Sequence, residues 1–364
     1  MLTTATGEPT RTHSDIRSQR LVSHGLTGAC PATPAEVVAR LGAVQAQDAG
    51  MARWAVGIRL PGSTERQVAE ALAKGEILRT HVLRPTWHLV AREDIRRMLA
   101  VSAGRIRSAL RASDKRRGID EADHVRVQGL VAEALGGGNH LTGRQIAGLL
   151  EAEGIGTGDY RLYLFLMRAE TDALIASGVP LGSTHTYALL DERAPRTDDL
   201  PFGESVCRLA RVYLRGHGPA TVQDFSWWSG LSAGEAAKGF SALGDEFEGF
   251  GAGGRTSYKA AGGQGAGGRA GTRQAHLLPA FDEYIIAYRD RSAAVPAAHA
   301  GKVFTKNGIF RPTILVNGRV VGTWRSPLGP GRKAELDFFE PPSKGVAAQV
   351  AKAAARRDAY YGKE

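Results

Sequence analysis

Three segments share a pattern that decides the fold: TPAEVVARLG at 33–42, TGRQIAGLLE at 142–151 and TVQDFSWWSG at 221–230. In each, a threonine is followed three residues later by Glu, Gln or Asp, and then by apolar residues at helical spacing. An N-cap threonine accepts a hydrogen bond from the third helical N–H, and the residue at that position bonds back to the cap. The pattern therefore predicts three short, capped, amphipathic helices in one chain.

The elements around the first copy are typical of a helix-turn-helix followed by a β-hairpin, the wing of a winged helix. We expect helices at 14–23, 33–43, 65–74 and 93–111, strands at 77–83 and 86–90, and a charged linker at 113–117. A domain boundary is expected near residue 115.

The other two copies have similar surroundings. The second predicts helices at 124–135, 142–153 and 160–176 and a strand at 184–190; the third begins near 204 and predicts a hairpin turn at Asn317-Gly318. The Gly-rich stretch 249–272 is expected to be a flexible loop that interrupts the third wing.

The sequence therefore predicts an α+β, mostly helical chain of three tandem winged-helix units. These units are expected at 1–115, 116–200 and 201–364. The third is expected to carry the Gly-rich insertion 249–272 and a C-terminal β-rich region.

The charge balance favours a polyanionic partner. The 364 residues include 47 basic and 37 acidic ones, a net charge of +10, and 37 of the basic residues are arginine, whose planar donors match phosphate oxygens and guanine edges. A GC-rich coding genome would also raise the arginine content. Only two cysteines occur, Cys30 and Cys207, which supports neither a zinc site nor a disulfide framework. No signal peptide or apolar span is evident, so we expect a cytoplasmic protein with no membrane association.

The tripeptide Gln45-Ala46-Gln47, followed by Asp48, comes directly after the first capped helix. In an extended segment residues i and i+2 point to the same side, so both amides would face one small volume, whereas on a helix they would diverge by about 200°. A site at this position therefore requires non-helical backbone. Alternatively, the two glutamines satisfy backbone groups at a helix C-terminus.

A resemblance to a known protein family rests on five stretches: LGAVQAQ at 41–47, LRTHVLRPTWH at 78–88, YALLDER at 187–193, LPAFDEY at 278–284, and the segment 311–324. Through them the chain resembles the AlkZ and YcaQ family of winged-helix DNA glycosylases, which unhook bulky and crosslinking alkyl lesions. The resemblance implies three tandem winged helices, and it implies that Gln45 and Gln47 are the catalytic pair. The Gly-rich stretch 249–272 is the part of the chain that matches the family least.

The resemblance predicts hydrolysis of the N-glycosidic bond of bulky or crosslinking N7-alkylated purines, in repair of or self-resistance to DNA-alkylating agents. Neutral amides suit this reaction, because a base alkylated at N7 already carries a positive charge and needs no strong acid to leave. Glutamine carbonyls would hold a water and stabilise the oxocarbenium-like sugar. Asp48 is a further candidate, as general base. With no lysine near the motif in sequence, we expect a monofunctional enzyme.

We expect DNA contacts from the first wing and from the C-terminal region, at Arg79, His81, Arg84, Trp87, His88, Arg311 and Arg325. Trp87 and His88 could equally be core residues. His81 and His88 lack a carboxylate at metal-ligand spacing, so we expect neither a metal nor another cofactor.

The expected partner is double-stranded DNA with alkylated purines. The alternative is a non-catalytic winged-helix transcription regulator. Regulators usually add a dimerisation or sensor part, whereas the repeated units fill this chain and no heptad helix is evident, which favours a monomeric enzyme. An RNA-binding role is disfavoured, because no aromatic strand motif of the RNA-recognition type occurs.

Overall fold

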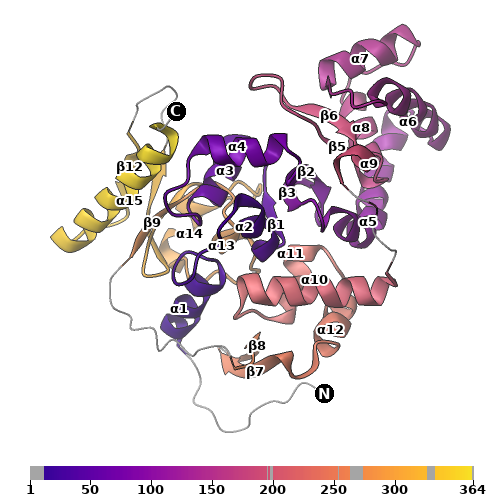
Figure 1. Cartoon of the computed structure of the whole chain (residues 1–364). Coiled ribbons are helices and arrows are strands. Elements are labelled where there is room, and N and C mark those ends of the chain that lie inside the picture. The colour runs from indigo at the N-terminus through magenta and orange to yellow at the C-terminus, as the bar shows by residue number, and fades with distance from the viewer. Residues whose placement is uncertain are drawn as a thin grey trace. The chain divides into compact units, whose positions relative to one another are not determined.

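The computed structural model describes residues 12–194, 196, 200–252, 254–262, 274–325 and 333–362. The chain forms two compact units: unit 1 comprises residues 1–69 and 206–364, and unit 2 comprises residues 70–205. Helices predominate, and the strand pairs within each unit are antiparallel (Figure 1), which confirms the predicted α+β class. No helix in these ranges is both long and apolar enough to cross a membrane.

Unit 2 contains the hairpin of the first wing and a complete winged helix. Its elements are β2 (Ile77–Val82), β3 (Thr86–Ala91), α5 (Ile95–Arg116), α6 (Glu121–Leu135), β4 (Leu141–Thr142), α7 (Gly143–Ala152), α8 (Arg161–Thr171), β5 (Ile175–Ser177), β6 (Thr186–Leu189) and α9 (Leu190–Arg193). The sheet order β4-β6-β5 places the strand before the helix-turn-helix beside the wing hairpin.

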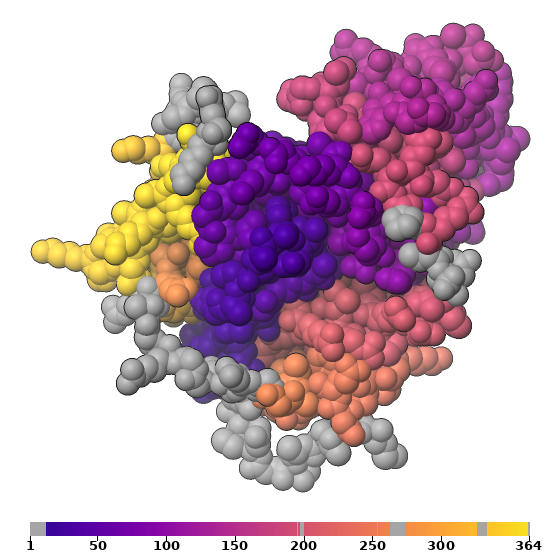
Figure 2. Space-filling view, viewed as in Figure 1, coloured from indigo at the N-terminus to yellow at the C-terminus, as the bar shows by residue number. Residues whose placement is uncertain are grey.

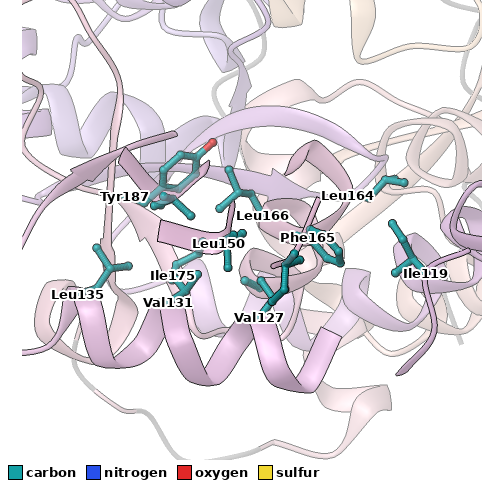
Figure 3. Close-up of a cluster of buried hydrophobic side chains, with 13 residues drawn as sticks. Ile119, Val127, Val131, Leu135, Leu150, Leu164, Phe165, Leu166, Ile175 and Tyr187 are labelled. Carbon is teal, nitrogen blue, oxygen red and sulfur yellow. The ribbon is translucent and has the colours of Figure 1, made fainter. Parts of the chain in front are cut away.

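The hydrophobic core of unit 2 is formed by one face of α6, by α7 and α8, and by the small sheet (Figure 3). Val127, Val131 and Leu135 recur every four residues along α6 and are almost fully buried, as helical periodicity requires. Trp87 packs against the same cluster from the β2–β3 hairpin. The face that carries Trp87 is therefore the one that packs on this core, although side chains on both faces of the hairpin are buried.

Two expectations for unit 2 were wrong. The helix expected at 160–176 ends at Thr171, because Ala173 has the left-handed φ of +59° that terminates helices, and 175–177 form β5 instead. The charged stretch 113–116, expected to be a linker, continues α5. The domain boundary expected near residue 115 thus falls inside helix α5. The division into three winged-helix units stays a prediction, whereas the structure divides into two compact units.

Unit 1 contains the third capped helix. Its elements after residue 200 are α10 (Phe202–His217), α11 (Val222–Ser229), α12 (Ala233–Ser241), η1 (Gly244–Glu246), β7 (Phe247–Ala252), β8 (Arg255–Ala260), β9 (Ala275–Leu278), α13 (Glu283–Ile286), η2 (Ala297–His299), α14 (Ala300–Val303), β10 (Thr313–Val316), β11 (Arg319–Arg325), β12 (Glu335–Phe338) and α15 (Lys344–Gly362). Ala220 forms a β-bridge with Tyr258 of β8, so the third winged helix also has its short first strand.

The β-hairpin of the third wing continues through the first part of the Gly-rich stretch. Residues 247–252 pair with 255–260 as the hairpin β7–β8. Phe247 and Phe250, three residues apart and so on opposite faces of the strand, are both buried, and this burial overrides the low strand preference of glycine. The expectation of a loop was therefore wrong for 249–252 and 255–260. Most of the remainder of the Gly-rich stretch, 263–272, lies outside the described residues.

The predicted C-terminal β-rich region is a four-stranded sheet of order β12-β11-β10-β9. Its β10–β11 turn is at Asn317-Gly318, as predicted, and both residues have the positive φ that a two-residue hairpin needs. Helix α15, which the sequence analysis did not predict, packs on β9. In the space-filling view this yellow helix lies against the indigo and violet N-terminal segment of the same unit (Figure 2), where the hydroxyl of Tyr360 donates to the carbonyl of Arg53 at 2.9 Å.

The N-terminal part of the chain forms α1 (His13–Ser23), α2 (Pro34–Leu41), β1 (Ala43–Gln45), α3 (Ala49–Gly57) and α4 (Glu65–Ala73). The three predicted caps are all present. Thr142 and Thr221 form complete capping boxes, whereas Thr33 caps α2 alone, because the carboxylate of Glu36 accepts from the N–H of Ala32 instead.

The repeat has a different register in its first copy. In the second and third copies a short strand directly precedes the helix that the threonine caps. In the first copy the helix that directly follows a strand is α3, and its cap is Asp48. By element order, the counterpart of Thr142 and Thr221 is therefore Asp48, not Thr33. The glutamine motif accordingly comprises the last residue of the first strand and the connection from it to the second helix of the winged helix.

Candidate active site

The Gln45–Asp48 segment is non-helical, as a site there requires. Gln45 ends the strand β1, and residues 46–48 form an irregular connection to α3. Gln45 is 8% exposed and Ala46 is fully buried, whereas Gln47 and Asp48 are exposed. The expected extended backbone is thus confirmed up to Gln45, and the break after it brings Gln47 to the surface.

Asp48 has a structural role in this segment. Its carboxylate accepts a hydrogen bond from the N–H of Met51 at 2.9 Å and so caps α3. An N-cap aspartate satisfies one of the orphan amides of the first helical turn and interacts favourably with the helix dipole. The carboxylate is therefore held at the helix N-terminus, directly beside Gln47.

A buried glutamate holds the other end of the motif. The backbone N–H of Gln45 donates to Oε1 of Glu283 at 3.0 Å, and the indole N–H of Trp228 donates to Oε2 at 3.1 Å. Glu283 is only 1% exposed. It begins α13, a short helix capped by Asp282, which accepts from the N–H of Tyr284 at 2.9 Å.

Asp282 also forms a buried ion pair. Its two oxygens accept from the two terminal nitrogens of Arg59, each at 2.8 Å, and both side chains are at most 1% exposed. The remaining guanidinium donors of Arg59 reach the carbonyls of Ala55 and His24. This bidentate geometry satisfies a charge pair that would otherwise be costly to bury.

The same core contains a neutral histidine. The hydroxyl of Tyr288 donates to the carbonyl of His217 at 2.6 Å, so it accepts from Nε2 of His24 at 2.7 Å. Burial, helped by the neighbouring His217 and Arg59, holds the pKa of His24 well below its usual range. Unit 1 therefore contains a buried polar network that includes Asp282, Glu283 and His24, and Glu283 joins it to the backbone of Gln45.

Two of the five DNA contacts predicted on the first wing are buried in unit 2. His81 and His88 are each 1% exposed. His81 bonds through Nδ1 to the carboxylate of Glu170 and through Nε2 to the hydroxyl of Tyr163 at 3.1 Å. Nδ1 of His88 bonds to the carbonyl of Thr86 at 2.9 Å. This burial disfavours direct DNA contacts by either ring.

The other predicted wing residues are half-buried. The guanidinium of Arg79 lies over the ring of Trp87 at 3.8 Å, and the rings of His81 and Trp87 are 4.0 Å apart. Burial raises the pKa of Glu170. Burial also lowers to about 3 the pKa of His185, whose ring centroid lies 5.3 Å from that of Trp87. Arg84, next to Pro85 at the hairpin turn, is half-buried as well.

The two predicted C-terminal contacts, Arg311 and Arg325, are exposed. Arg311 donates to the carbonyl of Lys302 at 3.4 Å, and Arg325 lies 3.9 Å from Glu335. In the described ranges no group of three His, Cys, Asp or Glu side chains is placed to hold a metal ion.

No role was predicted from the sequence for Asp282 and Glu283, although both lie in the stretch LPAFDEY at 278–284. Two adjacent acids between Phe281 and Tyr284, in an otherwise apolar run, are a signal that a buried polar network forms there. Their partners could not be inferred, because Gln45 lies 238 positions away.

Comparisons with known proteins place the chain in a family. A 128-residue stretch is 30% identical to the interstrand DNA cross-link repair glycosylase of Streptomyces sahachiroi, and the match spans about a third of each protein, 33% of this chain and 34% of the relative. The solved structure of the Streptomyces sahachiroi DNA glycosylase AlkZ superposes with a TM-score of 0.81 over 98% of both chains at 20% identity, which shows a shared fold. The family model for AlkZ-like DNA glycosylases matches residues 38–360, and this chain therefore belongs to that family.

Proposed function

We propose that this protein is a monofunctional DNA glycosylase that hydrolyses the N-glycosidic bond of bulky or crosslinking N7-alkylated purines. The observation that carries the proposal is the non-helical Gln45–Gln47 segment in a chain of the AlkZ-like family. Its role would be repair of, or self-resistance to, DNA alkylation. The enzyme would act in the cytoplasm as a monomer on double-stranded DNA.

In this proposal Gln45 and Gln47 act on the sugar rather than on the base. An N7-alkylated purine already bears positive charge, so its departure needs little proton donation. The amide oxygens would hold the attacking water and stabilise positive charge that develops on the deoxyribose. Asp48 would be the proton acceptor for that water, from its position beside Gln47.

A long basic stretch supports binding to DNA. Residues 291–334 contain no Asp or Glu but eight Lys or Arg. Those that are described and exposed are Lys302, Lys306, Arg311, Arg319, Arg325 and Lys333. Cations that no acidic residue within the stretch offsets attract the phosphate backbone without sequence preference.

The test is base release. The protein is incubated with duplex DNA carrying one N7-alkylguanine, and free base and abasic site are measured. We expect release by the wild type and its loss in Gln45→Ala and Gln47→Ala, with DNA binding retained. Binding without release by the wild type would overturn the proposal and favour a transcription regulator.

A further inference from the structure

The buried carboxylate of Glu283 is not explained by the proposed chemistry. Both its oxygens accept hydrogen bonds from inside unit 1, one from the backbone N–H of Gln45 and one from the indole of Trp228. At 1% exposure it is shielded from solvent, so it is badly placed to reach a sugar or an attacking water. Any effect of Glu283 on the reaction must therefore pass through the residues it holds.

We infer that Glu283 is a positioning residue, which fixes the backbone of Gln45 so that the motif presents its amides in the reactive geometry. The inference rests on the proposed function. Gln45 is the last residue of strand β1 and the backbone is irregular at 46–48, so regular structure orients Gln45 only from its N-terminal side. An acceptor on the N–H of Gln45 fixes the peptide plane from which the side chain projects. Displacements of about 1 Å can cost 10²-fold in rate.

A closed ring of contacts shows that the segment is held at both ends. At its start, Glu283 holds Gln45; at its end, Asp48 caps α3. The far end of α3 is tied by Arg59 to Asp282, the residue next to Glu283. The motif is therefore held on both sides by two neighbouring acids, the N-cap Asp282 and the first residue of α13, Glu283, so the start of this short helix supports the segment.

The test compares Glu283→Gln with the wild type. Glutamine has nearly the same shape and keeps one oxygen acceptor, but it turns an NH₂ group toward one of the two donors. We expect the single-turnover rate of base release from an N7-alkylguanine duplex to fall about tenfold or more, with the Kd for that duplex within twofold of the wild type. Hydrogen–deuterium exchange of the peptide covering 43–48 should accelerate.

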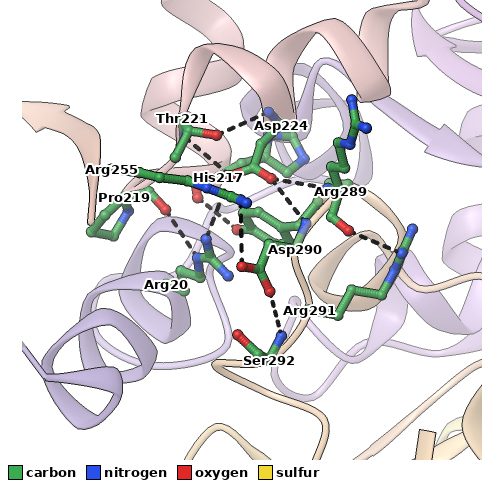
Figure 4. A network of polar contacts seen from close by, with 12 residues as sticks. Arg20, His217, Pro219, Thr221, Asp224, Arg255, Arg289, Asp290, Arg291 and Ser292 are labelled. Carbon is green, nitrogen blue, oxygen red and sulfur yellow. Dashed lines mark hydrogen bonds and ion pairs between the residues drawn. The ribbon is translucent and has the colours of Figure 1, made fainter. Parts of the chain in front are cut away.

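Asp224→Asn is the matched control. Asp224 is also a buried carboxylate of unit 1, 2% exposed, and it accepts from the backbone N–H groups of Thr221, Arg289 and Asp290 rather than from the motif (Figure 4). We expect this variant to lose thermal stability, to release base within twofold of the wild-type rate, and to leave exchange in 43–48 unchanged.

Three outcomes separate the possibilities. A wild-type rate in Glu283→Gln, or an equal loss of rate in Asp224→Asn at equal loss of Tm, overturns the positioning role. Absence of base release by the wild type overturns the proposed function instead. Should Glu283→Gln not fold, Glu283→Asp, which withdraws the carboxylate by one methylene, replaces it with the same expected results.

Discussion

The Gln45–Asp48 segment of unit 1 and the β2–β3 hairpin of unit 2 were both predicted to contact DNA, yet the structure places them differently. In the hairpin, His81 and His88 are buried and bonded within the unit. In the segment, the strand ends after three residues and Gln47 is exposed. Strict alternation tells which side chains share a face, but not whether that face meets the core or solvent.

For His81 the difference has a physical cause in a neighbouring residue. Trp87 pairs directly with His81 across the hairpin and packs on the core of unit 2, so His81 is drawn inside with it and must be satisfied there. His88, one residue after Trp87, lies on the opposite face and is buried as well. The glutamine motif has no aromatic neighbour in sequence and lies in a strand-to-helix connection. Connections of this kind carry functional side chains more often than regular strands do.

The largest expected effect concerns the network behind the motif. Asp282→Asn leaves the buried guanidinium of Arg59 without its counter-ion, so we expect unit 1 to lose about 3–5 kcal/mol of stability. The matched change in unit 2 is Glu121→Gln, which removes a partner of Arg168 that is 69% exposed and should cost less than about 1 kcal/mol. Urea unfolding measures both. Equal losses would show that burial of the pair does not distinguish the two units.

The second prediction concerns the exposed glutamine. Gln47→Ala should lower the rate of base release about 10²-fold or more, the usual loss when one preorganised polar group is removed from a reaction centre. Gln145→Ala is the control, because Gln145 is an amide that only completes a helix cap in unit 2. It should cost roughly 1 kcal/mol of stability and leave the rate unchanged. A Gln47→Ala enzyme with the wild-type rate would contradict the assignment.

Much of the fold follows from local signals in the sequence. Thr142 and Thr221 mark helix starts through short-range capping bonds, and Asn317-Gly318 marks a hairpin through backbone conformation alone. The register of the first repeat could not be found this way, because Asp48 lacks the Thr-x-x-Glu pattern and was considered only as a base. The role of Glu283 was not predicted, because its contact with Gln45 spans 238 positions and such a contact produces no periodic pattern in the sequence.

The third prediction uses pH to compare the units. In unit 1, burial lowers the pKa of His276 to about 4 and that of His24 well below 6.5. Because the unfolded chain binds these protons more readily, their stabilisation is complete above pH 6.5 and is lost as the pH falls toward 4. For His276 this loss is about 2 kcal/mol at pH 5.

Unit 2 has shifts in both directions. His185 titrates in the same direction as His276, whereas the raised pKa of Glu170 means that acid favours the folded state of that carboxyl. We expect exchange protection in unit 1 to fall between pH 7 and pH 5. His276→Gln should flatten that dependence, and its failure to do so would remove His276 as the cause.

The smallest expected effect tests whether the exposed cations, rather than the buried wing residues, meet DNA. Arg311→Ala removes one exposed charge from the acid-free stretch 291–334 and should weaken binding a few-fold, equally for alkylated and plain duplexes. The slope of log K against log salt should decrease by about 1, since one fewer counterion is released. His88→Gln, whose parent ring is buried and bonded to Thr86, should leave that slope unchanged. The opposite pattern would mean that the hairpin opens to bind DNA, and that the burial seen in unit 2 belongs to the unbound protein alone.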